Sequence, residues 1–154
     1  MQIPNPTTAQ TLYEVDFIGW VEQTSQLLRQ GNFREVDIEH LVEEIESLGK
    51  RDRRELTSRL IVLVSHLLKW QYQPGKQSNS WRCTIYEQRR QIQLILEDSP
   101  SLRRYLMEQL PKGYNAAIKQ AALETDLPLQ TFPVDCPYTG EEICSEGFFP
   151  GASR

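Results

Sequence analysis

Residues 37–71, DIEHLVEEIESLGKRDRRELTSRLIVLVSHLLKWQ, decide the fold. At about 100° per residue, the apolar side chains of this stretch fall on one continuous side of a helix. Leu56 stands a whole number of helical turns after Ile38, so both ends of the stripe face the same way. From Leu56 onward the apolar arc widens, which predicts neighbours on several sides of one long central helix. The stripe contains Ile38, Leu41, Val42, Ile45, Leu48, Leu56, Leu60, Leu63, Leu67 and Trp70.

Two residues interrupt this stripe. Gly49 and Asp52 stand on its apolar side, where neither residue suits a buried helix face. The sequence therefore favours a bend or a break near Gly49, either as a kink in one helix or as a junction between two. Asp37 is the predicted N-cap, and Val36 and Leu41 have the spacing of a hydrophobic staple around it.

Shorter helices are predicted on both sides of the central helix. The first spans about residues 16–29 and stops at Gly31, the residue type that most often ends a helix. A loop that turns at Pro74 leads into a third helix over residues 81–97. Its predicted buried stripe is Trp81, Ile85, Gln88, Ile92 and Ile95.

A fourth helix and an extended segment complete the predicted fold. Ser99 is the predicted N-cap of the fourth helix, Pro100 takes its first position, and the helix ends near Asp126. Residues 127–138 are proline-spaced and apolar, so we expect them to be extended and packed along the bundle. Residues 139–142 read as a capping box, which predicts one short terminal helix.

The predicted fold is an all-α, single-domain bundle of four to five main helices around the long central helix. We expect residues 1–11 to form a loose N-terminal arm, residues 12–150 the helical domain and residues 151–154 a tail. A chain of 154 residues is long enough to bury a core without disulfides or metals.

The composition is that of an ordinary soluble protein. A formal charge of −4 gives no overall attraction to nucleic acid or anionic membranes. The first residues lack the basic and apolar regions of a signal peptide, and the longest apolar run, residues 60–64, is too short to span a bilayer. The three cysteines lack the spacing of a disulfide framework, which favours reduced thiols. We therefore expect a cytoplasmic protein that does not enter membranes.

The sequence contains no recognisable catalytic motif. It has no phosphate-binding glycine loop, no Gly-x-Ser-x-Gly and no Cys-x-x-Cys, and Cys136 and Cys144 do not have the spacing of zinc ligands. Asp37-x-x-His40 imitates half of a di-iron site, but no second copy of the motif occurs, and His40 falls opposite the apolar stripe. We predict no catalytic residue, no metal site and no cofactor. Whether the protein is an enzyme stays open, although the lack of a catalytic motif argues against it.

One cluster of residues could form a ligand site. His66 lies at the edge of the apolar arc with Trp70 one turn away, and Trp81 and Arg82 stand in the first turn of the next helix. In an antiparallel hairpin the four side chains would converge near the loop, where they could bind an anion, a peptide terminus or an aromatic group. The alternative is that the two indoles belong to the core and that His66 hydrogen-bonds a buried carbonyl.

A second set of residues, all basic, could indicate nucleic-acid binding. The central helix carries a basic run at residues 50–54, but Asp52 and Glu55 are interleaved with it and no aromatic residues accompany it. A solvated, ion-paired surface is the favoured interpretation, for this run and for Arg82, Arg89, Arg90, Arg103 and Arg104.

Several segments resemble, in the same order, a bacterial family catalogued as domain of unknown function number twenty-nine. They are LYEVDFIGWVEQTSQLLRQGNF (12–33), LVEEIESLGKRDRRELTSRL (41–60), HLLKWQYQP (66–74), SWRCTIYEQRRQI (80–92), DSPSL (98–102) and TDLPLQTFPVDCPYT (125–139). The resemblance implies an all-helical cytoplasmic bacterial protein and no activity, and its recurring blocks include the four residues of the cluster. Two residues depart from the family pattern: Cys83 replaces an expected alanine, and Asp126 replaces an expected glycine and must accept a left-handed backbone.

Three functions from different classes follow as hypotheses. The first is a module that binds a protein partner or a second copy of itself, because the domain is small and helical, with a proline-spaced apolar tail and no catalytic constellation. The second is a small-ligand or anion site, with or without catalysis, at His66, Trp70, Trp81 and Arg82. The third is a regulator linked to nucleic acid through the basic run of the central helix, which the interleaved acids disfavour.

Overall fold

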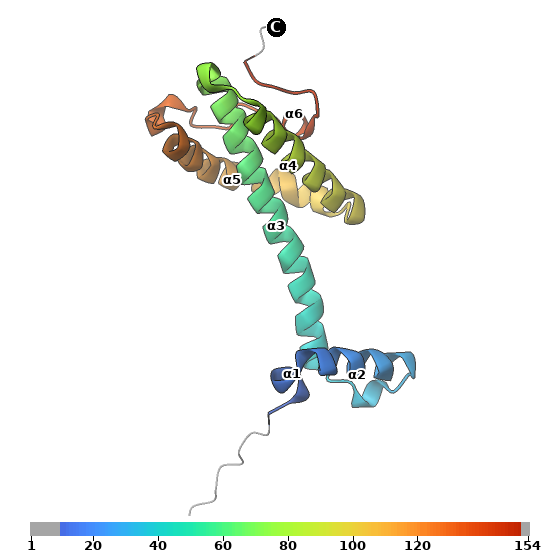
Figure 1. The fold of residues 1–154 in the computed structure, drawn as a ribbon. Coiled ribbons are helices and arrows are strands. Elements are labelled where there is room, and N and C mark those ends of the chain that lie inside the picture. Colours follow the sequence, from blue (N-terminus) through green and yellow to red (C-terminus); the bar gives the residue numbers. More distant parts are fainter. Residues whose placement is uncertain (1–9, 152–154) are drawn as a thin grey trace, which may run out of the picture. The chain divides into compact units, whose positions relative to one another are not determined.

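The computed structural model describes residues 10–151 and contains six α-helices, three short 3₁₀ helices and no strand within them (Figure 1). The all-α prediction is confirmed. Residues 1–9 of the predicted arm and residues 152–154 of the predicted tail lie outside the described residues. The chain divides into two compact units between Gly49 and Lys50.

The long helix α3 runs without interruption from Ile38 to Tyr72. Asp37 caps its start as predicted, because the Asp37 carboxylate accepts a hydrogen bond from the His40 backbone N–H at 3.3 Å. Of the two predicted interruptions, a junction between two helices at Gly49 is wrong, since α3 neither ends nor restarts there, whereas a kink within the helix stays a prediction. A single glycine inside a helix costs only about 1 kcal/mol relative to alanine, which is too little to interrupt a helix of this length.

The N-terminal unit is built from a few local elements. A one-turn helix α1 (Leu12–Val15), which was not predicted, precedes α2 (Phe17–Arg29), and α2 agrees with the predicted first helix. The chain turns at Gly31, whose φ of 72° lies in the left-handed region, as expected for a helix stop. A 3₁₀ turn, η1 (Phe33–Glu35), leads into the first part of α3.

The C-terminal unit contains the rest of α3 together with α4 (Asn79–Asp98), α5 (Leu102–Thr125) and α6 (Gly140–Cys144). Two 3₁₀ turns, η2 (Pro74–Lys76) and η3 (Leu129–Thr131), precede α4 and follow α5. The stripe of α3 from Leu56 onward is buried here, as its widening arc predicted. The buried residues of α3 in this core are Leu56, Leu60, Leu63, Val64, Leu67 and Leu68.

The start of α5 differs from the prediction, whereas its end agrees. Ser101 is the N-cap, and the predicted cap Ser99 instead closes α4 through its backbone N–H, which donates to the carbonyl of Ile95 at 2.9 Å. Pro100 therefore lies in the turn between the helices. At the other end Asp126, which stands where the family has glycine, adopts the left-handed conformation with φ of 58°, as predicted.

The buried face of α4 is rotated relative to the predicted stripe. Ile85 and Ile92 are buried as predicted, but Arg89 and Leu96 are buried in place of Gln88 and Ile95. Arg89 sets this rotation through its hydrogen bonds to the C-terminal segment, which the apolar pattern of the helix could not reveal.

The segment after α5 packs on the bundle as predicted. Tyr114 donates a hydrogen bond to the carbonyl of Pro133 at 2.6 Å, and Tyr138 donates to Gln71 Oε1 at 2.7 Å. The capping box that starts α6 is present, since Glu142 N–H donates to Thr139 Oγ1 at 3.1 Å. These contacts make the C-terminal segment part of the core of its unit.

Candidate functional site

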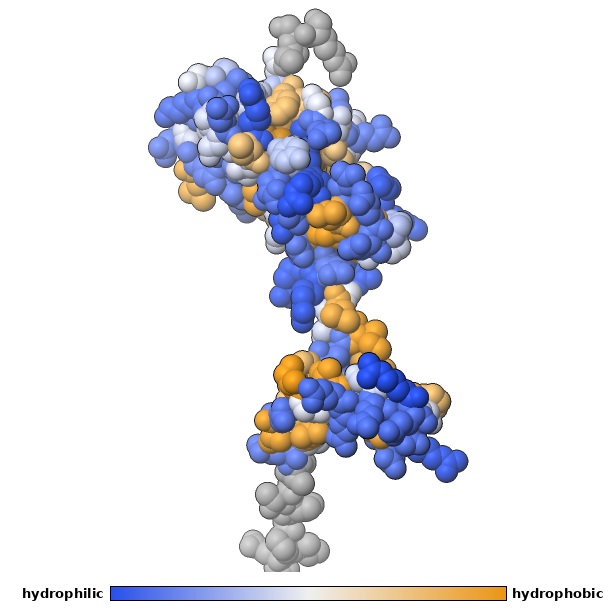
Figure 2. Space-filling view, turned by 45° about the vertical axis from the view of Figure 1, so that its right-hand side comes forward, coloured by the Kyte–Doolittle hydropathy of each residue, from blue (hydrophilic) through white to orange (hydrophobic). Residues whose placement is uncertain are grey.

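The N-terminal unit leaves an unusual amount of apolar surface uncovered. Among the described residues, seventeen large apolar side chains are exposed, and eleven of them lie between Leu12 and Leu48. Figure 2 shows apolar surface gathered over the unit that carries α1 and α2. Surface of this kind in one region is typical of an interaction site rather than of scattered exposed residues.

Part of this surface forms a groove, called here the α2–α3 groove. It is an open concavity of 360 Å³ between α2 and the first part of α3. Phe17, Val21 and Leu28 contribute from α2, where they recur at the spacing of one helix face. The whole lining comprises Phe17, Trp20, Val21, Thr24, Ser25, Leu28, Leu41, Glu44, Ile45 and Leu48.

An aromatic and acidic network fixes one end of this unit. The Tyr13 ring stacks on the His40 ring at 4.0 Å and meets the Trp20 ring edge-on at 4.9 Å. The Tyr13 hydroxyl donates to Glu44 Oε1 at 2.5 Å, and this hydrogen bond raises the pKa of Tyr13 to about 12. Tyr13 therefore connects α1 to the first part of α3, beside the α2–α3 groove.

His40 is half-buried in this network, whereas the sequence indicated a solvated side chain. Its Nδ1 lies 2.5 Å from Asp37 Oδ2, and this hydrogen bond raises the pKa of His40 and lowers the pKa of Asp37. No group of three or more His, Cys, Asp or Glu side chains that could hold a metal ion occurs within residues 10–151.

Charge is distributed unevenly between the two units. Residues 1–49 contain nine acidic and two basic side chains, a formal charge of −7. Residues 50–154 contain twelve acidic and fifteen basic side chains, a formal charge of +3. The overall charge of −4 therefore conceals a strongly acidic N-terminal unit.

The structure brings together two of the four residues of the predicted ligand cluster. The Arg82 guanidinium lies over the Trp70 ring, 5.7 Å from its centroid, and both residues line a pocket of 350 Å³ with Gln77, Ser78 and Asn79. The Trp70 ring also contacts Phe149 at 4.9 Å. A cation over an indole face is a favourable contact, so this pocket has one fixed positive group.

The other two residues of the cluster lie near Lys69 rather than in this pocket. His66 Nδ1 lies 2.8 Å from the carbonyl of Val62, one turn earlier, and burial lowers the pKa of His66. The Trp81 ring instead contacts the Lys69 ammonium at 4.7 Å. Neither His66 nor Trp81 lines the pocket beside Trp70. Whether the cluster binds a ligand stays a prediction.

Lys69 is a central residue of this region that the sequence analysis missed. It is buried on α3, and its ammonium group forms an ion pair with Glu124 of α5 at 2.6 Å. The two residues are 55 positions apart, so no local pattern connects them. A lysine inside the apolar arc was the available signal, because a buried lysine requires a partner.

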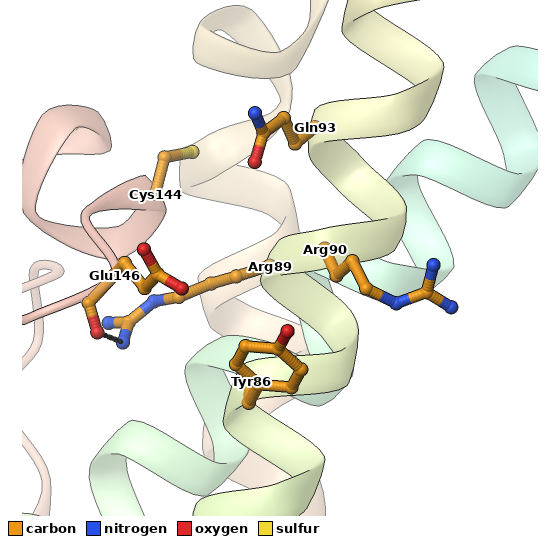
Figure 3. Close-up of a pocket in the computed structure, with 6 residues that line it drawn as sticks. All are labelled: Tyr86, Arg89, Arg90, Gln93, Cys144 and Glu146. Atoms are coloured by element: carbon orange, nitrogen blue, oxygen red, sulfur yellow. Dashed lines mark hydrogen bonds between the residues drawn. The ribbon is translucent and has the colours of Figure 1, made fainter.

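A different pocket lies where α4 meets the C-terminal segment (Figure 3). Arg89 extends into it, and its guanidinium donates to three backbone carbonyls, those of Ile143 at 2.8 Å, Glu146 at 3.3 Å and Phe148 at 2.7 Å. Arg90 also lines the pocket, but its guanidinium extends to the side opposite Cys144 and Glu146 and pairs with Glu87. Arg89 was predicted to be a solvated surface residue, and this was wrong. Because each of its nitrogens is already engaged, Arg89 is a structural clasp rather than a free anion-binding group.

Comparisons with known proteins complete these observations. Within the described residues no helix is both long enough and apolar enough to cross a membrane. No curated protein and no solved structure matches the chain. The family described as domain of unknown function DUF29 matches residues 12–149, which is most of the 154-residue chain. The protein therefore belongs to the DUF29 family, as its sequence segments indicated.

Proposed function

We propose that this protein is a protein-interaction module and that the α2–α3 groove receives a helix of a partner protein. The observation that carries the proposal is the exposure of the groove walls. Ile45 and Leu48 of α3 are 58% and 57% exposed, and Phe17 of α2 is 45% exposed. Because these side chains are about half exposed, a partner that buried one of them would gain about half of the roughly 1.5–3 kcal/mol that full burial contributes.

A helix is the occupant that fits the geometry. The groove runs between two helices, so its walls repeat at helical spacing on both sides. A partner helix with apolar residues at i, i+3, i+4 and i+7 presents a matching stripe, as in other complexes where a helix docks into a groove. A partner that fills the groove would also complete a unit too small to bury a core of its own.

The test uses a neutral amphipathic peptide of about four helical turns, with leucine at the stripe positions and glutamine elsewhere. On addition of this peptide to the full chain, amide NMR signals of residues 17–28 and 41–48 are expected to shift. The double variant Ile45→Gln, Leu48→Gln should lose these shifts, because its groove wall is polar. The control Leu123→Gln alters a side chain that is 82% exposed on α5 and should leave them unchanged. Shifts that are absent, or that persist in the double variant, would contradict the proposal.

A second candidate function is anion binding at the pocket beside Trp70, with Arg82 as the positive group. This proposal keeps the predicted residues Trp70 and Arg82 as direct contacts and leaves His66 and Trp81 as neighbours. Titration with inorganic phosphate should shift the Arg82 side-chain NMR signals at low salt. No shift in the wild-type protein, or an equal response in Arg82→Gln, would remove this candidate.

The nucleic-acid alternative has less support than either of these. The basic run at residues 50–54 is exposed, but Arg59 of the next turn pairs with Glu55 at 2.8 Å, and Arg53 lies over the Tyr105 ring at 6.0 Å. Two basic side chains of this region are therefore engaged within the unit, and Asp52 and Glu55 interrupt the remaining charge, so the basic surface is not continuous.

A further inference from the structure

We propose that the helix received by the α2–α3 groove is cationic, with lysine and arginine on either side of its apolar stripe. This inference rests on the proposed docking function and adds the charge of the partner to it. Three observations support it: the acidic charge of the N-terminal unit, the position of its carboxylates beside the exposed stripe, and the scarcity of basic side chains there.

One carboxylate lies in the groove, and three others stand on the outer sides of the two helices that form it. On α3, Glu39 stands three residues before the exposed Val42 and Glu46 stands four residues after it, so both lie one turn from Val42 along the helix surface. On α2, Glu22 stands four residues after the exposed Ile18. Glu44 itself lines the groove. Acidic side chains therefore border the apolar surface on both helices.

The only basic side chains of this unit lie at the end of α2 and in the following turn. Arg29 is in the last turn of α2, and Arg34 lies in η1. A cationic helix would thus meet Glu44 in the groove and the negative potential of the other carboxylates around it. Charge complementarity of this kind accelerates association and disfavours partners of the same sign.

The same charges argue against a second copy of the chain as the occupant. Docking two N-terminal units groove to groove would bring together two formal charges of −7. The basic segment of the chain, residues 50–54, cannot replace a cationic partner either, because all five of its side chains are exposed and polar and it offers no apolar stripe. Anionic lipid would be repelled in the same way as a second acidic unit.

The experiment compares two peptides that share the apolar stripe of the neutral peptide. One carries lysine at the flanking positions and the other carries glutamate. We expect the lysine peptide to bind the full chain more tightly than the neutral peptide and the glutamate peptide to bind more weakly. Raising the ionic strength from about 0.1 M to about 1 M shortens the Debye length from about 10 Å to about 3 Å and should abolish the preference.

Matched variants locate the charges that matter. Glu44→Gln removes the carboxylate that lines the groove and keeps an oxygen that can accept the hydrogen bond of the Tyr13 hydroxyl. This variant should weaken binding of the lysine peptide by about 1.5- to 5-fold, the range expected for one exposed ion pair. The control Glu141→Gln removes the same charge from an exposed position of the other unit and should leave the affinity unchanged. Equal effects of the two variants would show general attraction to an acidic protein and would overturn the inference.

The possible outcomes separate this inference from the docking proposal. If all three peptides bind equally and the Ile45→Gln, Leu48→Gln variant abolishes binding, docking stands and the cationic partner is overturned. If no peptide binds, both proposals fail. A dimer in sedimentation experiments that dissociates in the groove variant would show that a second copy is the occupant, which also overturns the inference.

Discussion

The two parts of α3 have the same apolar period and opposite surroundings. In the second part Leu63 and Leu67 are completely buried, whereas in the first part Ile38 and Ile45 are 53% and 58% exposed. Three other α-helices and the C-terminal segment cover the second part, whereas the first part has only α2 along one side and Tyr13 of α1 against His40 and Glu44. The difference shows that an apolar period identifies the side of a helix that avoids water, but it does not show whether the same chain covers that side.

The largest expected effect separates the two parts directly. Leu63→Ala should lower the free energy of unfolding by about 2–5 kcal/mol, because it opens a cavity in a closed core. Ile45→Ala should change it by less than about 0.5 kcal/mol, since the side chain is already in contact with water. Urea denaturation of the two variants measures both values. Comparable losses would show that the first part of α3 is covered in the folded protein and would break the comparison.

A somewhat smaller effect is expected at the clasp of the C-terminal unit. Arg89→Met keeps most of the aliphatic length but leaves three carbonyl groups without their donor, at a cost of about 2–4 kcal/mol. Arg90→Met, one residue later and exposed, should cost less than about 0.5 kcal/mol. Denaturation gives the stability, and faster proteolysis within residues 143–149 should accompany the loss in Arg89→Met alone.

The smallest effect concerns the two histidines, one in each part of α3. The Asp37 carboxylate raises the pKa of His40 above 6.5, whereas burial lowers the pKa of His66 below 6.5. The interaction of protonated His40 with ionised Asp37 therefore stabilises the fold fully below pH 6.5, as long as Asp37 stays ionised. This stabilisation is lost as the pH rises through the raised pKa of His40. His66 acts in the opposite sense: the folded protein loses stability as the pH falls through 6.5 toward the lowered pKa.

One NMR titration observes both rings. Asp37→Asn keeps a side chain that can cap α3 but removes the charge, so the pKa of His40 should fall toward 6.5 while that of His66 stays unchanged. If His40 and His66 had the same pKa in the wild-type protein, this result would contradict the structural difference between the two parts of α3.

Local chemistry explains most of what the sequence could predict. Asp37 at the start of α3 and the capping box at α6 act on backbone groups three residues away, so their sequence neighbours identify them. The left-handed Asp126 was predicted from the family resemblance instead, because glycine is expected at this position. At Gly49 only the predicted break is wrong, since the cost of one glycine is small beside the hydrogen bonds of a long helix, and the alternative of a bend stays a prediction.

The residues that sequence reasoning misplaced depend on distant partners. Arg89 is buried because backbone carbonyls 54 to 59 residues further along the chain accept hydrogen bonds from its guanidinium. Lys69 is buried because its ammonium group forms an ion pair with Glu124. Neither partner can be read from a helical wheel. The same limit applies to Trp70 and Arg82, which meet as expected for a hairpin, and to His66, whose nearest polar partner is its own helix.

The clasp at Arg89 also has a consequence for the order of folding. Its three hydrogen bonds close long loops, and such contacts carry a high entropic cost before they form. We therefore expect them to be absent from the folding transition state, with φ-values near zero. Removing the clasp would then leave the folding rate almost unchanged and accelerate unfolding, so Arg89 governs how long the folded C-terminal unit persists rather than how fast it is reached.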